Sequence, residues 1–218
     1  MGHPHWPLFE LEVRTARLVL RYLDDELASE LATLAADGVH DPSWMPFAIE
    51  WTDVPSPELE RNALRYWWSC RAATSPDQWE INLAVVVEGV PAGVTSIGAA
   101  DFPITRTFHT GSWLGRAFQG RGIGTEMRAA TLHLGFAGFD AERATTAAFV
   151  DNAASLGVTR KLRYAPNGTA VSVRRGVAGE QQHFVLTRDV WSQRRRDDIE
   201  LAGLDGAREL LGIPPVVS

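Results

Sequence analysis

The sequence predicts one α+β domain in which helices pack on a mixed central sheet. Several short runs alternate apolar and polar residues, as strands do, whereas other runs place apolar residues at the three-to-four-residue spacing of a helix face. The two kinds of run are interspersed, without an internal repeat or an obvious linker. We therefore assign residues 1–218 to one domain, with a core at 13–190 and a C-terminal extension at 191–218.

The amino-acid composition limits the classes of function that this protein can have. Hydrophobic residues make up 45% of the chain and charged residues 22%, which is typical of a globular protein with a sizeable core. Acidic residues outnumber basic ones by 27 to 21, so the net charge is −6. Nucleic-acid binders commonly carry a broad basic surface, so we expect no nucleic-acid partner, and an anionic ligand would have to be bound locally.

The sequence predicts a cytoplasmic protein without a membrane span or a metal. The longest aliphatic run, Leu83–Val87, is far shorter than the roughly 20 residues that cross a bilayer. Glu10, Glu12 and Arg14 stand where a signal peptide would have its apolar core. Cys70 is the only cysteine, which excludes an internal disulfide and a multi-cysteine metal site.

The first elements follow from local patterns. Alternation over 17–23 predicts a strand, and the aspartates at 24–25 can cap the helix that follows. Residues 40–56 are rich in Pro, Trp and Asp, which indicates an irregular loop. These aromatic residues would either line an acceptor pocket or cover an edge of the core. Ser56 could then cap a helix over 57–73.

From residue 79 the apolar period changes to two and continues to a turn at Glu88–Gly89. The strands at 79–88, 90–101 and 106–116 would form an antiparallel meander, and a helix, a strand and a second helix follow it. Two last strands precede the extension, which covers either the core or a dimer face. These later elements are predicted at 122–136, 143–150, 153–163, 168–176, 181–190 and 203–211. The order is β-α-α-β-β-β-α-β-α-β-β.

The most informative segment runs from Gln119 to Thr125, between a strand and a helix. Gly120, Gly122 and Gly124 lack Cβ atoms, so backbone N–H groups and the positive end of the helix can approach a phosphate. The chain has no Gly-Lys pair, which excludes a Walker loop, and Thr125 stands where a dinucleotide fingerprint needs its third glycine. A plain strand-to-helix turn is the remaining alternative.

Three motifs in order resemble those of one family. Gln119–Gly124 matches the [QR]-x-x-G-x-[GA] coenzyme A motif of the GNAT acetyltransferase superfamily. The segment 14–21 resembles the T-x-R-L-x-L-R opening of its Rim-type branch, which acetylates the N-termini of ribosomal proteins. The segments 151–156 and 161–164 resemble the N-x-x-S helix and the K-L-G-[FY] ending of that branch. The resemblance covers residues 13–190.

The resemblance implies a sheet that splays between the fourth and fifth predicted strands, with the pantetheine arm of acetyl-CoA bound in the gap. Acetyl-CoA would be a co-substrate, and no metal is implied. The loop would hold the pyrophosphate, while the helix after the fifth strand would face pantetheine or the sulfur. The residues implied to bind the coenzyme are Leu114, Gln119, Gly120, Arg121, Gly122, Ile123, Gly124, Thr125, Asn152 and Ser155.

Two catalytic groups are also implied. The backbone N–H near Leu114 would stabilise the negatively charged carbonyl oxygen. Many relatives have a tyrosine acid seven residues after the helix asparagine, but that position is Thr159 in this chain. We therefore predict that Ser155 is the acid, with helix capping or packing as its alternative role. Some relatives have a glutamate base where this chain has Ala147.

Without that glutamate, Glu80 is our first candidate for the base. If the hairpins close as predicted, Glu80 shares one face of the sheet with a polar row that also contains Asn82, Ser96 and Ser112. Two residues nearer the hairpin end, Asp101 and His109, are the other candidates for the base.

The function implied is acetyl transfer to a primary amine by direct attack in a ternary complex. An α-amine is about 10–20% neutral near pH 7, whereas a lysine amine is neutral in well under about one molecule in a thousand. A site without a strong base therefore favours an α-amine such as a protein N-terminus, or a small-molecule amine with a perturbed pKa, with water relaying the proton. The alternative is a non-catalytic coenzyme-A-binding sensor or partner subunit. A homodimer is left open.

Overall fold

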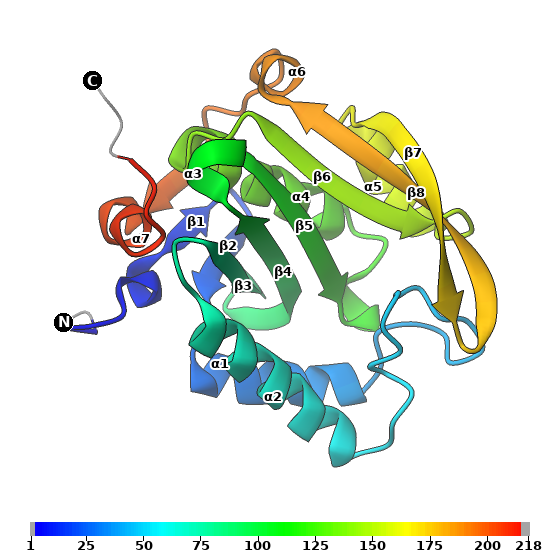
Figure 1. Ribbon diagram of the computed structural model, residues 1–218. Helices are drawn as coiled ribbons and strands as arrows, with labels where there is room; N and C mark the ends of the chain where they lie inside the picture. The colour runs from blue at the N-terminus through cyan, green and yellow to red at the C-terminus, as the bar shows by residue number, and fades with distance from the viewer. Residues whose placement is uncertain (1–2, 215–218) are drawn as a thin grey trace.

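The computed structural model describes residues 3–214 and consists of a central sheet with helices on both faces (Figure 1). Its strands are β1 (Glu12–Arg14), β2 (Leu18–Tyr22), β3 (Gln78–Val87), β4 (Val90–Ala100), β5 (Thr107–Leu114), β6 (Arg143–Phe149), β7 (Ala165–Arg174), β8 (Val177–Thr187) and β9 (Glu200–Ala202). Its α-helices are α1 (Asp25–Ala36), α2 (Glu58–Ala73), α3 (Phe102–Thr105), α4 (Ile123–His133), α5 (Ala153–Lys161), α6 (Arg188–Ser192) and α7 (Leu204–Leu210).

The sheet has nine strands in the order β7-β8-β6-β5-β4-β3-β2-β1-β9. All described pairs are antiparallel except β5 with β6, which run parallel because α4 crosses over between them. The predicted mixed α+β fold is confirmed. Two short strands that the sequence did not reveal, β1 and β9, extend the sheet beyond β2.

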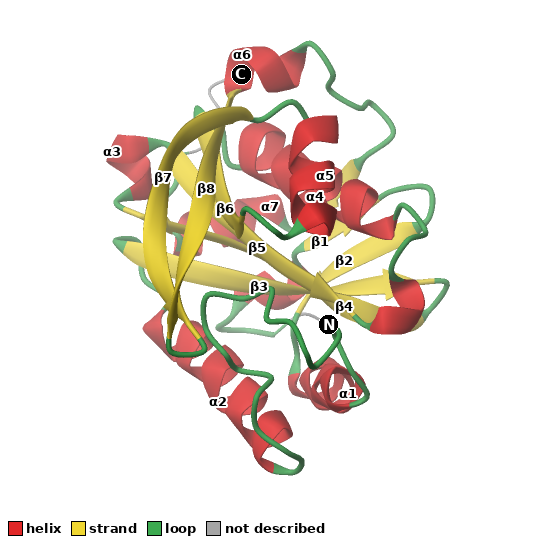
Figure 2. Cartoon of the chain, turned by 90° about the vertical axis from the view of Figure 1, so that its right-hand side faces the viewer, coloured by secondary structure: helices red, strands yellow, loops and turns green. Residues whose placement is uncertain are grey.

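The parallel pair holds together over only three residues. Thr107–His109 pairs with Arg143–Thr145, and beyond this point β5 and β6 diverge (Figure 2). The predicted splay between these two strands is therefore present. It leaves backbone N–H and C=O groups of both strands facing a gap within the sheet, where they need another partner.

The two faces of the sheet bury different clusters. Ile81 and Leu83 on β3 point into the main core beneath α4. Ala84, which points to the opposite face, packs with Val94 against α1 and α2, where Trp67 is buried. The period-two pattern seen in the sequence thus separates the face beneath α4 from the face covered by the first two helices.

Helix starts follow the predicted capping at α1 but not at α2. Asp24 accepts a hydrogen bond from the backbone N–H of Leu27 at 2.8 Å, which caps α1 as expected. The prediction that Ser56 caps the second helix is wrong: α2 begins at Glu58 with Pro57 in the cap position and no side-chain cap. Two acids in its first turn provide the favourable charge there instead.

The C-terminal extension packs against the rest of the molecule. Trp191 stacks on Phe136 with ring centroids 5.0 Å apart, and β9 adds to the edge of β1. Ala207 and Leu211 belong to the main apolar cluster. Of the two roles left open for this segment, the structure shows coverage of the core. None of the described helices is long and apolar enough to cross a membrane.

Candidate active site

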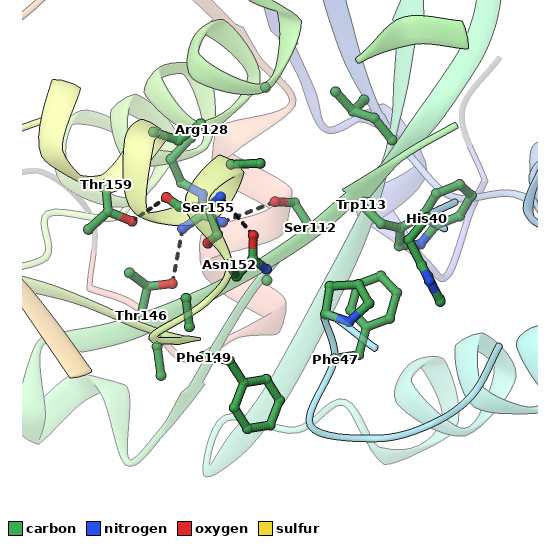
Figure 3. Close-up of a pocket in the computed structure, with 18 of the residues that line it drawn as sticks. His40, Phe47, Ser112, Trp113, Arg128, Thr146, Phe149, Asn152, Ser155 and Thr159 are labelled. Atoms are coloured by element: carbon green, nitrogen blue, oxygen red, sulfur yellow. Dashed lines mark hydrogen bonds between the residues drawn. The ribbon is translucent and has the colours of Figure 1, made fainter. Parts of the chain in front are cut away.

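A cleft of about 390 Å³ opens where β5 and β6 part, bounded by α4 and α5 (Figure 3). It brings together several residues singled out in the sequence, which come from the end of β5, the glycine loop and the start of α5. The predicted site residues that line it are Leu114, Gln119, Gly124, Asn152 and Ser155. The cleft thus lies at the unpaired strand edges.

The loop before α4 has the backbone shape that its glycines predict. Gly120 and Gly122 have φ values of 72° and 79°, in the left-handed region that residues with a Cβ atom rarely adopt. Gly122 is the N-cap of α4 and has no side chain to satisfy the first N–H groups of the helix. These donors and the helix dipole together favour an anion here.

Side chains of the loop fix its position. The Gln119 amide donates to the carbonyl oxygens of Val39 at 2.7 Å and of Leu114 at 2.8 Å, so it ties the loop to the end of β5. Ile123 is buried in the main core and anchors the first turn of α4. The exposed Arg121 lies over the ring of Phe118, with 6.0 Å from guanidinium carbon to ring centroid.

The opening motif of the chain contacts this loop. Thr15 donates to Glu126 at 2.6 Å, and Arg17 donates to the same carboxylate at 2.7 Å and to the Arg121 carbonyl at 3.3 Å. Burial alone would raise the pKa of Glu126, but the hydrogen bonds from Thr15 and Arg17 lower it. The T-x-R pattern is therefore explained physically: it holds the first turn of α4.

At the opposite wall, Asn152 caps α5 by accepting from the backbone N–H of Ser155 at 3.0 Å. The Thr159 hydroxyl donates to the Ser155 carbonyl at 2.9 Å, so it is used within the helix. Both described hydrogen bonds of Ser155 thus use its backbone, and its half-buried side chain lines the cleft. This arrangement supports Ser155 rather than Thr159 as a donor to a ligand.

A buried arginine that the sequence analysis missed lies where the strands part. Arg128 is 7% exposed, and its guanidinium donates to Thr110 on β5 at 2.7 Å, to Thr146 on β6 at 3.1 Å and to Ser112 at 3.0 Å. Its Nε has no partner, and no described carboxylate forms an ion pair with it. A buried, uncompensated cation favours negative charge in the cleft. The sequence contains one indication of this residue, since Arg128 lies one helical turn after Gly124 and therefore on the same face of α4.

The candidate base Glu80 lies on the other side of the sheet. Its Oε2 accepts from His109 Nε2 at 2.6 Å across Gly98, so the first candidate and one of its alternatives form a pair. Asp101 lies at the hairpin end with a φ of 49°.

Within residues 3–214, no group of three or more His, Cys, Asp or Glu side chains could hold a metal ion.

The predicted polar row is correct in part. Asn82 pairs with Ser96, and Ser96 with Gly111, so these positions share the face of Glu80. Ser112 pairs instead with Thr95 and its hydroxyl bonds to Arg128 on the opposite face, so its inclusion in the row is wrong. Side chains along a strand alternate between the two faces of the sheet. In the observed register, the Ser112 side chain lies on the face opposite to that of Glu80.

A second groove, of about 600 Å³, lies on the face covered by α1 and α2. Aromatic rings from the loop 40–56, from α2 and from β5 line it, as the Trp-rich loop suggested. It shares Phe47, Ala48 and the stretch Gly111–Trp113 of β5 with the first cleft. Two ligands bound in these hollows would therefore approach each other at one strand.

Comparison with known proteins agrees with this geometry. A family model described as an acetyltransferase (GNAT) domain matches residues 17–165. A RimL ribosomal L7/L12 alpha-N-protein acetyltransferase in complex with coenzyme A is similar in fold, with 21% identity, a TM-score of 0.64, and coverage of 81% of this chain and 97% of that one. A GCN5-related N-acetyltransferase from Brucella melitensis has 17% identity, a TM-score of 0.65, and coverages of 83% and 80%.

A third similar structure is the microcin C7 self-immunity acetyltransferase MccE in complex with acetyl-CoA and AMP, with 18% identity, a TM-score of 0.60, and coverages of 79% and 93%. The matched domain spans more than half of the chain, which therefore belongs to the GNAT acetyltransferase family. The protein is an acyltransferase of this class, and the family that the three motifs predicted is confirmed.

The Glu80–His109 pair predicts a pH-dependent stability. The hydrogen bond to Glu80 raises the pKa of His109 above its ordinary value. The stabilisation is thus fully present below the unfolded-state value of about 6.5 and is lost as pH rises through the higher folded-state value. Glu80→Gln should lower the melting temperature more at about pH 5.5 than at about pH 9. In a His109→Gln background, an equally pH-dependent loss would contradict the assignment.

Proposed function

We propose that this protein is an acetyl-CoA-dependent N-acetyltransferase that transfers an acetyl group to a primary amine by direct attack in a ternary complex. The observation that carries the proposal is the cleft between β5 and β6, which ends at a helix N-terminus without a side-chain cap. An extended amide-containing chain with a diphosphate at one end matches both features: open strand edges for its amides and free N–H groups for its phosphates.

The residues divide between binding and chemistry. The backbone of Gly120, Gly122 and Gly124 would hold the diphosphate of the coenzyme, whose pantetheine arm would lie between β5 and α5 against Leu114 and Asn152. Thr110 on β5 lies four residues before Leu114, about 13 Å away at the rise of a strand. The thioester would therefore lie toward the point where the strands part, where Arg128 is buried.

The reaction is the replacement of a C–S bond by a C–N bond. The neutral amine nitrogen attacks the thioester carbonyl carbon, and negative charge develops on the carbonyl oxygen. A backbone N–H of β5 between Thr110 and Leu114, beyond the end of its pairing with β6, would stabilise that charge. The C–S bond then breaks, and the departing sulfur takes a proton from Ser155, whose hydroxyl regains a proton from water. Arg128 favours the negative charge at both stages because its guanidinium is buried without a carboxylate. The proton lost by the amine passes through water to the Glu80–His109 pair.

A minimal substitution in the loop tests coenzyme binding. A Cβ atom added at Gly124 would lie 3.7 Å from Leu114 and 3.8 Å from Val158, at ordinary contact distance, so Gly124→Ala fits the free protein. Stability should stay equal or rise by up to about 1 kcal/mol, since glycine is unfavourable in helices. The coenzyme motif accepts alanine at this position, so Gly124→Ala should bind coenzyme A as the wild type does. Gly124→Asp instead adds a carboxylate beside the expected diphosphate, and calorimetric titration should show at least about a tenfold weaker affinity for coenzyme A.

Gly157→Asp is the matched control, because Gly157 lies on α5 with open space around its added Cβ atom. It should leave coenzyme affinity unchanged. Equal affinities of wild type and Gly124→Asp would contradict the assigned position of the coenzyme.

A second prediction concerns Arg128. Arg128→Met keeps a long, flexible side chain and removes the charge, so kcat should fall by about 10²–10³, as for loss of one oxyanion donor. Arg128→Lys, which retains the charge without the planar fork, should recover part of the loss. Steady-state kinetics on variants whose folding is verified by circular dichroism measure both effects. A variant with Met that keeps the wild-type kcat would exclude Arg128 from the chemistry.

Ser155→Ala distinguishes an acid from a capping residue. The cap of α5 uses the Ser155 N–H, which alanine retains, so stability should be nearly unchanged. Loss of the hydroxyl should reduce kcat by about 10²–10⁴ if it donates the proton. A wild-type kcat with acetyl-CoA would leave Ser155 only its structural role.

The function itself is tested by release of coenzyme A thiol from acetyl-CoA in the presence of amines. Acetylated product and free thiol should appear in equal amounts. Tight acetyl-CoA binding without turnover for every amine would instead favour the non-catalytic sensor.

A further inference from the structure

We propose that the acceptor is a small primary amine carried on a flat aromatic or apolar body, with one positive charge, and not a polyamine or a polypeptide N-terminus. This inference rests on the proposed function and names its substrate class. Three observations carry it: the lining of the second groove, the distribution of charge around it, and the contacts that hold the loop from which part of its lining comes.

The groove ends at the position where the amine must attack. Gly111, Ser112 and Trp113 on β5 line both the coenzyme cleft and the second groove, and these hollows lie on opposite faces of the strand. A Cβ atom at position 111 would lie 3.0 Å from the Ser96 hydroxyl, so the glycine keeps this part of the floor open. An acceptor lying in the groove can thus reach a thioester in the cleft past this segment.

Aromatic rings form the wall of the groove. Phe47, Trp51 and Trp113 follow one another with centroid separations of 5.4 Å and 5.7 Å, and Trp67 and Tyr66 of α2 lie across from them. Figure 3 shows Phe47 and Trp113 on the same side of the cleft, across from Ser155 and Thr159. A volume of about 600 Å³ with such a lining suits a flat apolar group, and each ring can also contact a single ammonium through its π face.

The charge around the groove excludes strongly cationic acceptors. Its described lining contains no aspartate or glutamate, and its polar side chains, including Asn62, Asn82 and Ser96, are neutral. The nearby Glu80 already pairs with His109. A second ammonium on a diamine would lose water without gaining a carboxylate, which is unfavourable in a partly buried site.

The loop 40–56 is held in place by the tip of the β7–β8 hairpin, seen beside it in Figure 1. Arg174 donates two hydrogen bonds to Asp151, at 2.8 and 2.9 Å, and Trp44 donates to the same carboxylate at 3.2 Å. Arg175 donates to both oxygens of Asp53, at 2.7 and 2.5 Å. Paired bidentate contacts resist opening more than single ones, so the loop that supplies Phe47 and Trp51 to the groove would not move aside readily to admit a polypeptide chain.

The test compares three classes of acceptor (aromatic amines, polyamines and a peptide) with the wild-type protein, at fixed acetyl-CoA and with thiol release as the readout. Tryptamine and 2-phenylethylamine should have a kcat/KM at least about tenfold higher than putrescine, spermidine or a peptide with an N-terminal serine. An equal or higher value for a polyamine or the peptide overturns the inference but leaves the proposed function intact. Acetyl-CoA binding without acetylation of any amine overturns both.

Two variants locate the acceptor. Trp51→Ala removes one wall of the groove and should raise the KM for 2-phenylethylamine at least about tenfold while leaving acetyl-CoA affinity unchanged. Trp68→Ala is the matched control, because Trp68 is 47% exposed on α2 and does not line the groove. An equal effect of both variants, or no effect of Trp51→Ala, would contradict the placement.

Asn62→Asp tests the charge argument. Arg65 donates to the Asn62 side chain at 2.9 Å and would pair with the new carboxylate, so the substitution is made together with Arg65→Gln and compared with Arg65→Gln alone. It then adds an unpaired carboxylate to the lining with almost no change in shape. The ratio of kcat/KM for putrescine to that for 2-phenylethylamine should rise at least about tenfold. An unchanged ratio in a folded variant would mean that the acceptor does not contact this wall.

Discussion

The cleft depends on one buried guanidinium that spans the gap between two diverging strands. Thr110 and Thr146 are the first residues after the pairing of β5 and β6 ends, and Arg128 donates a hydrogen bond to each of them. It therefore replaces the ladder hydrogen bonds that end there and keeps both strands at a fixed separation. Because no described carboxylate pairs with it, the same group that fixes the shape of the cleft also determines its charge.

The features predicted from the sequence are those encoded by neighbouring residues. The Asp24 cap, the turn at Glu88–Gly89 and the left-handed glycines at 120 and 122 all depend on contacts within a few positions of the chain. The family resemblance added what local patterns could not, namely the splay between β5 and β6.

What could not be predicted depends on register and on distant contacts. Ser112 was assigned to the wrong face because the pairing of Gly98 with His109 sets the parity of β5, and a one-residue difference reverses every side chain. The spacing of Arg128 from Gly124 places it on the same face of α4, but its contacts with Thr110 and Thr146 can be known only once α4 is placed beneath the parted strands. The pairing of Glu80 with His109 across Gly98 likewise appears only once three strands are aligned.

The segment Gly111–Trp113 serves two hollows on opposite faces of one strand. A ligand in the cleft would therefore pack against the same backbone segment that a ligand in the groove contacts. By thermodynamic linkage, each occupant must then change the affinity for the other by the same factor. This three-residue segment would therefore couple the two hollows, so that the affinity for a ligand in one of them depends on whether the other is occupied.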